Sequence, residues 1–290
     1  MTRINHNISA FIAVDQLARN NRGLAFSLQR LSTGMRINRS SDDVAGLAVS
    51  EKLRTQIRGT TVAERNANDG IAMLQIAEGS LSEMTNILQR LRELAVQGAN
   101  GTYGSVERSY LDREFQSLLE EVNRIALSSQ YNGITLLDGG MASFGSTGST
   151  SSVLHIGANF DANGLGTSID TLQVHISPAT LGSLGLSIGA VAVSTGSSAL
   201  TALDLLDHAI RSVNAVRSEL GATVNRLESA LQSLQTQEVN MTSAESTIRD
   251  TDFAKEMTEM TRNQILVQSA TAMLSQANQT PQSILSLLQG

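Results

Sequence analysis

The chain has 290 residues, of which 41% are hydrophobic, so it is long enough to bury a sizeable core. Its net charge of −6, without blocks of lysine or arginine, argues against nucleic acid or an anionic membrane as the main partner. It has no cysteine, which excludes disulfides and thiolate metal sites. Because it has neither a run of about 18 apolar residues nor a cleavable signal at its start, we expect a cytosolic protein, unless it is exported by a route that reads no cleaved signal.

The first part of the chain predicts a helix that ends shortly after residue 31. Its apolar stripe consists of Ile4, Ile8, Phe11, Leu24, Leu28 and Leu31. The stretch that follows, STGMRINRSSDD, is rich in residues that break helices, because short polar side chains bond the nearby backbone and glycine relaxes it. Residues 32–43 therefore predict a joint between two helical parts.

Helical periodicity resumes after this joint. Asp42 or Asp43 is placed to cap a new helix, and apolar residues recur at steps of three and four from residue 74 to residue 95. The turn-forming stretch GANGTYGS separates this pattern from a further helix with apolar residues between Leu111 and Ile125. That helix is expected to end at SSQYNGITLLDGG, residues 128–140.

The middle of the chain has a different composition. Residues 139–200 concentrate Gly, Ser and Thr around two short alternating runs, SVLHIG and LQVHIS, and Pro178 closes the second. Alternation bounded by turn residues is typical of β-strands, so we expect one or more hairpins too small to form a sizeable domain.

The last third of the chain again predicts long helices. From Leu203 to Met241 the stripe is apolar at alternating steps of three and four, except at Arg217 and Glu238, which indicates a coiled-coil seam. Such a helix of about 40 residues would be roughly 60 Å long. The polar residues 240–252 predict a second joint that matches the first, since both interrupt the same two stripes.

The final segment carries a stripe of its own. Its members are Phe253, Met257, Met260, Val267, Ala270, Leu274 and Ala277, and, after an interruption expected at Pro281, Ile284 and Leu288. The first and last stripes are too narrow to be stable alone, so we expect them to pair with each other. A two-helix pair still leaves apolar surface uncovered, which requires neighbouring copies of the chain.

The fold class predicted from these patterns is mainly α. We expect a long antiparallel coiled-coil bundle built from both chain ends, with a small β-hairpin region in the middle. The residues expected to pack between subunits are Ile4, Ile8, Phe11, Leu24, Leu28, Leu31, Met257, Met260, Val267, Leu274, Ile284 and Leu288.

The sequence offers little chemistry. Its four histidines are scattered, and only His208 follows a carboxylate, Asp204, at helical spacing, where a solvated polar face is the simpler interpretation. No phosphate-binding Gly-Lys-Ser/Thr loop is present. The sequence therefore predicts no enzyme, with no catalytic residue, cofactor or metal.

Several stretches resemble, in the same order, those of bacterial flagellins, the proteins of the flagellar filament. The stretch LSTGMRINRSSDDVAGLAVSEKLR, residues 31–54, is similar to the family signature LSSG-R-INSA-DD-AGLA. Further similar stretches are INHNISA, AERNANDGIAMLQIAEGSL, LQRLRELAVQGANGTY, YNGITLLDG and MLSQANQTPQSILSLL. The resemblance covers roughly residues 1–140 and 198–290.

The resemblance implies a structural subunit that polymerises into the flagellar filament. It would be exported unfolded by the flagellar type III secretion apparatus and assembled at the filament tip beneath a cap. Residues 1–43 and 247–290 would form an inner core domain, residues 44–140 and 198–246 an outer helical bundle, and residues 141–197 a hairpin insert of that bundle. The spoke between the layers would include Gly34, Arg36, Asn38, Asp42 and Asp43.

The partners implied by the resemblance are other proteins of the flagellum. They are further copies of the chain, hook-associated junction and cap proteins, an export chaperone on the C-terminal helix, and other flagellins or sheath proteins. The protein would reside in an extracellular or a periplasmic flagellum. The family also implies a surface for a vertebrate innate immune receptor, formed here by Gln89, Arg90, Leu94, Gln97 and Glu114. A simpler role for these positions is packing between adjacent filament subunits.

Three alternatives remain at this point. A hook–filament junction protein shares the end helices, but such proteins usually match the spoke motif less fully. A secreted enzyme on a flagellin scaffold would need a longer insert with paired zinc-ligand histidines. A coiled-coil adaptor would explain the heptads but not the two matching joints.

Overall fold

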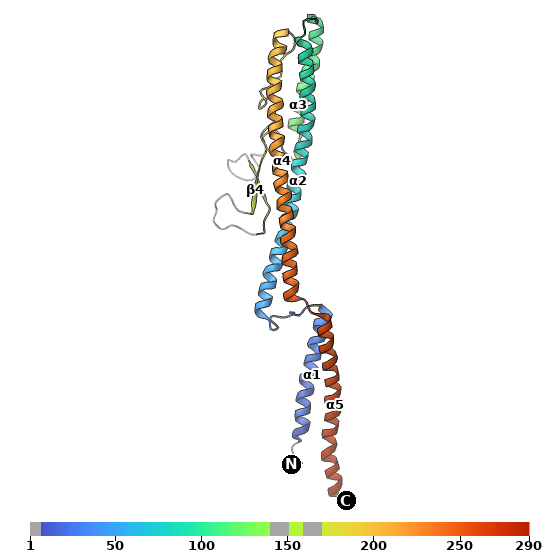
Figure 1. Cartoon of the computed structure of the whole chain (residues 1–290). Coiled ribbons are helices and arrows are strands. Elements are labelled where there is room, and N and C mark those ends of the chain that lie inside the picture. Colours follow the sequence, from blue (N-terminus) through green and yellow to red (C-terminus); the bar gives the residue numbers. More distant parts are fainter. Residues whose placement is uncertain (1–6, 140–150, 159–169, 290) are drawn as a thin grey trace. The chain divides into compact units, whose positions relative to one another are not determined.

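The computed structural model describes residues 7–139, 151–158 and 170–289 of the chain. Long helices dominate it, and two short hairpins accompany them (Figure 1). The helices are α1 (Ile8–Thr33), α2 (Val44–Ala99), α3 (Ser105–Ser128), α4 (Gly196–Arg249) and α5 (Phe253–Gln289). The strands are β1 (Gln130–Tyr131), β2 (Ile134–Thr135), β3 (Ser151–His155) and β4 (Thr171–His175). The predicted fold class, mainly α with small hairpins in the middle, is confirmed.

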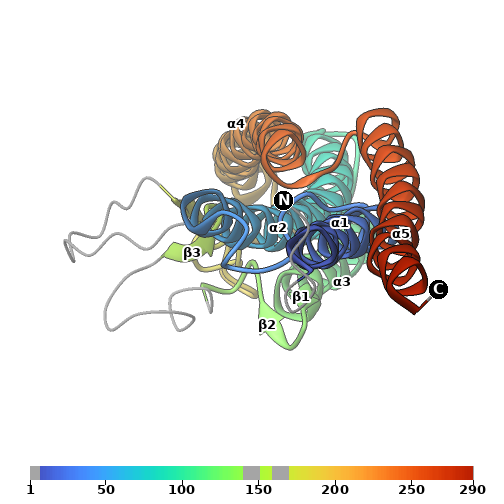
Figure 2. The ribbon, with the colours of Figure 1, turned by 90° about the horizontal axis from the view of Figure 1, so that it is seen from below.

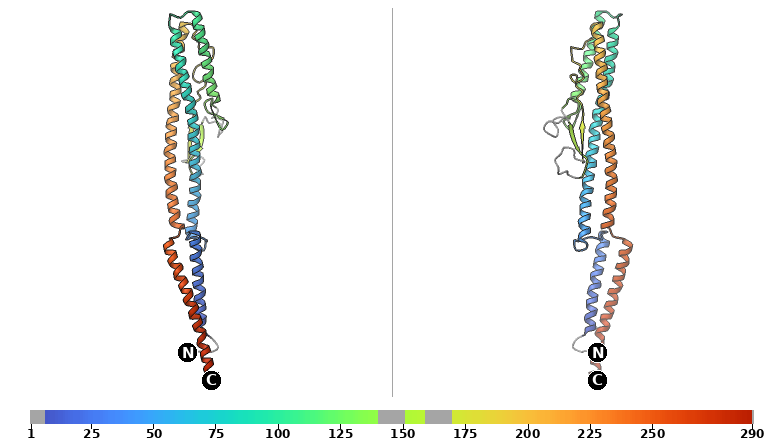
Figure 3. Two further views of the ribbon diagram at one scale, coloured as in Figure 1. Left: turned by 90° about the vertical axis from the view of Figure 1, so that its right-hand side faces the viewer. Right: turned by 60° about the vertical axis from the view of Figure 1, so that its left-hand side comes forward.

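The chain forms two compact units. One consists of Met1–Thr55 and Asn240–Gly290, and the other is Gln56–Val239. In the second unit α2, α3 and α4 run alongside one another (Figure 3) and bury a continuous apolar core. The stripe predicted from residue 74 to residue 95 is the α2 side of this core: Leu74, Ala77, Leu81, Met84, Leu88, Leu91 and Ala95 are fully buried. Phe115 and Leu119 of α3 and Leu206 and Leu220 of α4 complete it.

The hairpin of β3 and β4 packs against α2 in the same unit. The strands are antiparallel, with Leu154 opposite Leu172, and they match the two alternating runs in the sequence. Two glycines of α2 make room for it. A Cβ at Gly59 would lie 2.9 Å from the Cβ of Ala158, and one at Gly70 would clash with the side chain of Leu154.

A second hairpin was not predicted. β1 pairs antiparallel with β2 directly after α3, and Asn132 and Gly133 form the two-residue loop between them. Their φ angles of 49° and 80° are both positive, as a type I′ turn requires. The Asn-Gly pair in SSQYNGITLLDGG is the sequence signal for this turn, in a stretch predicted above only to end a helix.

Two expectations about helix ends are wrong. α4 continues to Arg249, so only residues 250–252 of the predicted joint 240–252 lie outside helices. A hydroxyl side chain can form a hydrogen bond with a carbonyl of the preceding helical turn. Thr247 does so, donating to the Ser243 carbonyl at 2.9 Å, so such residues are compatible with a continuing helix. Pro281 does not interrupt α5, which runs to Gln289. A proline inside a helix removes one backbone hydrogen bond and crowds the carbonyl four residues earlier, which is why an interruption is expected, but here the helical backbone continues through it.

Candidate assembly surfaces and joint

The two terminal helices form an antiparallel pair, as predicted. α1 and α5 run side by side in the long view and in the end view (Figure 1, Figure 2). Near one end of the pair, the amide Nδ2 of Asn7 donates to the Ala277 carbonyl at 2.8 Å. Towards the other end, Arg30 lies 3.6 Å from the carboxylate of Glu256, which is only 9% exposed.

The seam of this pair is narrow and mixes alanines with leucines and a few polar residues. Its half-buried or buried positions follow heptad spacing and are Ala10, Ala13, Leu17, Asn20, Leu24, Ser27 and Leu31 on α1, and Glu256, Met260, Asn263, Val267, Ala270, Leu274 and Ala277 on α5. Five residues expected to pack between subunits therefore have a place inside the single chain: Leu24, Leu31, Met260, Val267 and Leu274.

Other large apolar side chains of the pair lie outside the seam and are exposed. On α1, Phe11 is 77% exposed, and Ile8 and Leu28 are exposed by more than half. The other large apolar side chains exposed on the pair are Ile12, Val14, Phe26, Phe253, Met257, Ile265, Leu266 and Met273. Of the remaining predicted contacts, Ile4 lies outside the described residues, as do the side chains of Ile284 and Leu288. Many large apolar side chains exposed on one helix pair are typical of an interaction surface.

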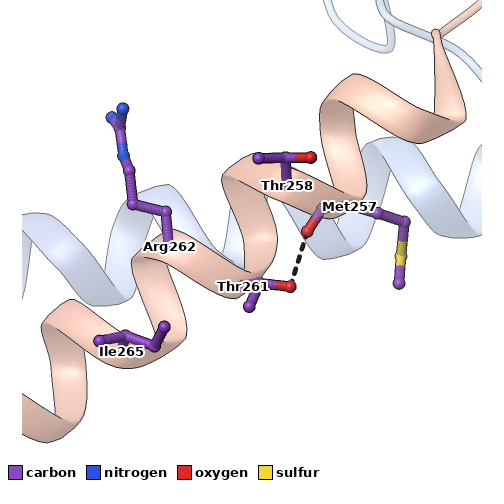
Figure 4. Close-up of a pocket in the computed structure, with 5 residues that line it drawn as sticks. All are labelled: Met257, Thr258, Thr261, Arg262 and Ile265. Atoms are coloured by element: carbon purple, nitrogen blue, oxygen red, sulfur yellow. Dashed lines mark hydrogen bonds between the residues drawn. The ribbon is translucent and has the colours of Figure 1, made fainter.

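One shallow groove lies on this exposed side of α5. It has a volume of about 510 Å³ and is lined by Met257, Thr258, Thr261, Arg262 and Ile265 (Figure 4). The hydroxyl of Thr261 donates to the Met257 carbonyl at 2.9 Å, which satisfies its hydrogen-bonding group within the helix. The groove thus offers mainly apolar surface, with Arg262 as its charged member.

Of the predicted joint 32–43, residues 32 and 33 still belong to α1, and residues 34–43 form an ordered segment that is tied to the end of α4. Gly34, with a φ of +71°, ends α1 in the left-handed conformation that favours glycine. The backbone then pairs with the return chain, because Arg36 N–H donates to the Arg249 carbonyl at 2.7 Å and Thr251 N–H donates to the Gly34 carbonyl at 3.0 Å. The guanidinium of Arg36 also donates to the Ile248 carbonyl at 2.6 Å.

The two aspartates of the joint have different tasks. The Asp42 carboxylate accepts from the backbone N–H groups of Asn38 and Arg39, at 3.1 and 2.9 Å, and these bonds hold the pKa of Asp42 below its usual value. Asp43 accepts from the N–H of Gly46 at 2.8 Å and so caps the start of α2. The side chain of Asn38 closes the segment by donating to the Met35 carbonyl at 2.8 Å.

Arg249 is a joint residue that the sequence analysis missed. Its side chain is 15% exposed and lies 2.8 Å from the carboxylate of Glu51 on α2. Its Nε also donates to the sulfur of Met35 at 3.2 Å. The hydrogen bond from Arg249, followed by that from Arg54, lowers the pKa of Glu51. A basic residue in the last turn of a helix favours the helix end, and that position was the available sequence signal.

The residues of the expected receptor surface divide between the surface and the core. Gln89, Arg90 and Glu114 are exposed, and Arg90 forms an ion pair with Glu114 at 2.9 Å. Gln97 donates to the Tyr103 hydroxyl at 2.9 Å. Leu94 is only 1% exposed, so its assignment to a surface is wrong: its heptad spacing directs it into the bundle core.

The described residues offer no arrangement for metal chemistry. No group of three or more His, Asp or Glu side chains among them could hold a metal ion. No helix within the described part of the chain is both long and apolar enough to span a bilayer.

Comparison with known proteins agrees with these features. The bacterial flagellin N-terminal helical region matches residues 4–142, and the bacterial flagellin C-terminal helical region matches residues 203–288. The chain is 44% identical over 291 residues to flagellin FlaB2 of Treponema pallidum and to the flagellar filament 33 kDa core protein of Treponema phagedenis. Each alignment covers 98% of this chain and 99% of the relative.

A solved structure shares the fold. It is described as that of a flagellar hook-associated protein from Vibrio parahaemolyticus, and it aligns with a TM-score of 0.56 and 16% identity over 72% of this chain and 100% of that one. The identity to the two Treponema proteins, over nearly the full length of each, is far higher than this. On the two family matches and the near full-length relatives, the chain belongs to the bacterial flagellin family.

Proposed function

We propose that the chain is a structural subunit of a bacterial flagellar filament and that it polymerises through the outward faces of α1 and α5. The relatives named as flagellar filament core proteins support the first part. One observation carries the second: the terminal pair buries only one narrow seam and leaves further large apolar side chains, such as Phe11, exposed. Burying one such side chain contributes roughly 1.5–3 kcal/mol, so several of them offset the entropy lost on association.

The arrangement favours an open polymer. The exposed faces of α1 and α5 carry different residues, so a neighbouring copy that docks on one face leaves the other free. A head-to-tail contact that does not close produces a helical filament instead of a ring.

The proposed layers follow the expected domain division. Residues 1–43 and 247–290 would form the inner layer, and residues 44–140 and 198–246 the surrounding bundle, with residues 141–197 as its insert. Gly34, Arg36, Asn38, Asp42 and Asp43 would act as the spoke, and the hydrogen bonds of this segment to the end of α4 support that role. Because the insert is short, the outer layer would stay thin enough for other flagellins or sheath proteins to coat it.

The proposed route and partners are those of the family. The chain would pass unfolded through the flagellar type III apparatus with an export chaperone on α5, and would meet hook-associated junction and cap proteins in an extracellular or periplasmic flagellum. The lack of cysteine suits this route, since no disulfide has to be broken before export. An innate immune receptor surface at Gln89, Arg90, Gln97 and Glu114 stays a prediction.

The assembly role is tested by seeded growth. Purified full-length chain is warmed with short filament seeds, and the growth rate is measured by electron microscopy for the wild type, Phe11→Ser and a chain without residues 1–40. We expect no growth of the truncated chain, and growth of Phe11→Ser reduced by about tenfold because an exposed apolar anchor is lost. Gln16→Ala, an exposed polar position on the same helix, is the matched control and should grow like the wild type. Undiminished growth without residues 1–40 would contradict the proposal.

A further inference from the structure

The seam between α1 and α5 contains a glycine and an asparagine that face each other. Gly23 is the one glycine within α1. The nearest atoms that a Cβ at this position would meet all belong to Asn263: Nδ2 at 3.1 Å, Cγ at 3.3 Å and Oδ1 at 3.4 Å. These distances are too short for relaxed packing, so the missing side chain at Gly23 makes room for the Asn263 amide.

Asn263 is unusual for its position. It occupies a half-buried seam position of α5 at which heptad spacing would accept an apolar side chain. Among the described residues the amide of Asn263 has no hydrogen-bond partner, so it does not stabilise the pair as a leucine would. A polar residue at a single seam position lowers stability but selects one geometry of the helix pair.

The geometry selected here also controls the outward face of α1. Phe26 follows Gly23 by three residues and is 48% exposed, while Ser27 follows by four and is only 4% exposed. Each residue turns the helix by about 100°, so a rotation of α1 at Gly23 would redirect Phe26 and the other exposed apolar side chains.

We propose that Gly23 and Asn263 form a fitted pair that fixes how closely, and at what rotation, α1 lies on α5. The pair thereby positions the apolar face that a neighbouring copy has to meet. This inference rests on the proposed function, because the direction of that face matters only if it packs against a second chain.

The test is a double-mutant cycle in the full-length chain, read by seeded filament growth. Gly23→Ala places a methyl group against the Asn263 amide, and we expect growth to fall about tenfold, as overpacking displaces α1. Adding Asn263→Ala removes the obstructing amide and should restore growth to within about twofold of the wild type. Gly221→Ala, in a helical position with open space around it, is the matched control and should leave growth unchanged.

Cysteine cross-linking measures the pairing without filaments. The chain has no native cysteine, and seam spacing places Leu17 opposite Ala270, so Leu17→Cys with Ala270→Cys reports how often the helices pair in solution. We expect the cross-linking rate to fall with Gly23→Ala and to recover with Asn263→Ala. Equal rates for Gly23→Ala and the wild type, no recovery in the double variant, or an equal loss in Gly221→Ala would overturn the inference. Failure of the wild type to elongate would instead contradict the proposed function, and the cross-linking result would still decide the inference.

Discussion

Glu64 on α2 and Glu238 on α4 bring two carboxyl groups together in the bundle. The hydroxyl of Thr61 donates to Glu238 at 2.9 Å, whereas Oε1 of Glu64 is buried and has no hydrogen-bond partner among the described residues. Burial, and then the nearby charge of Glu238, raise the pKa of Glu64 above its usual value of 4.5. This is the reverse of Asp42, whose pKa is lowered by backbone hydrogen bonds in the joint.

The raised pKa of Glu64 predicts a pH effect of opposite sign to ordinary acid denaturation. The folded state binds this proton more tightly than the unfolded state, so the free energy of unfolding falls as the pH rises from 4.5 through the higher folded-state pKa. Glu64→Gln should therefore raise the free energy of unfolding at pH 7 by roughly 0.5–1 kcal/mol and remove this part of its pH dependence. Urea unfolding between pH 4 and pH 8 measures this. Glu228→Gln, elsewhere on α4, is the control, and a variant less stable than the wild type at pH 7 would contradict the assignment.

Among the secondary-structure elements, the packing of the β3–β4 hairpin on α2 explains two glycines that are unfavourable inside a helix. Gly59 and Gly70 lie inside α2, where glycine is unfavourable by about 1 kcal/mol relative to alanine. Between them Ala63 and Ala67 are almost fully buried. Helical spacing places the four small residues in one strip along α2, and the contacts at Gly59 and Gly70 show that the β3–β4 hairpin lies against the two ends of this strip.

The contact between the hairpin and α2 predicts that alanine substitutions at two glycines of α2 change the stability in opposite directions. Gly70→Ala should destabilise the bundle by about 1–3 kcal/mol, because its methyl group meets the side chain of Leu154. Gly79→Ala, with nothing within 4 Å of the added carbon, should stabilise it by up to about 1 kcal/mol through helix propensity. Thermal unfolding of the two variants measures both effects. Stabilisation by Gly70→Ala would show that the hairpin does not rest on this strip.

Elements were predicted correctly where the spacing of apolar residues fits only one type of secondary structure. The stripe of α2 and the alternating runs of β3 and β4 are such cases. Helix ends were predicted less well, because Ser and Thr between residues 240 and 249 bond their own helix as readily as they end one. Arg249 was missed because its partner Glu51 lies 198 residues away in the chain.

The structure was also needed to tell which residues of the terminal stripes face the α1–α5 seam and which are exposed. A stripe shows that a face is apolar, but not whether its partner belongs to the same chain. Leu24 and Leu31 face the seam, whereas Phe11 and Leu28 do not, and all four belonged to one predicted set.

The whole molecule has two kinds of apolar surface, one buried within the chain and one exposed on the terminal helices. In the unit Gln56–Val239 the long apolar stripes of α2, α3 and α4 are buried within one chain, so this core forms without a partner. In the other unit several large apolar side chains of α1 and α5 stay exposed, and a two-helix pair joined by one narrow seam is marginal by itself. The terminal helices should therefore become stable only when copies of the chain assemble.

Hydrogen exchange of monomer and filament tests this claim most directly. We expect the backbone amides of α1 and α5 to exchange rapidly in the monomer and to be protected by about a hundredfold or more in filaments, while the buried core of α2, α3 and α4 is protected in both. Terminal helices already as well protected in the monomer as that core would contradict the account.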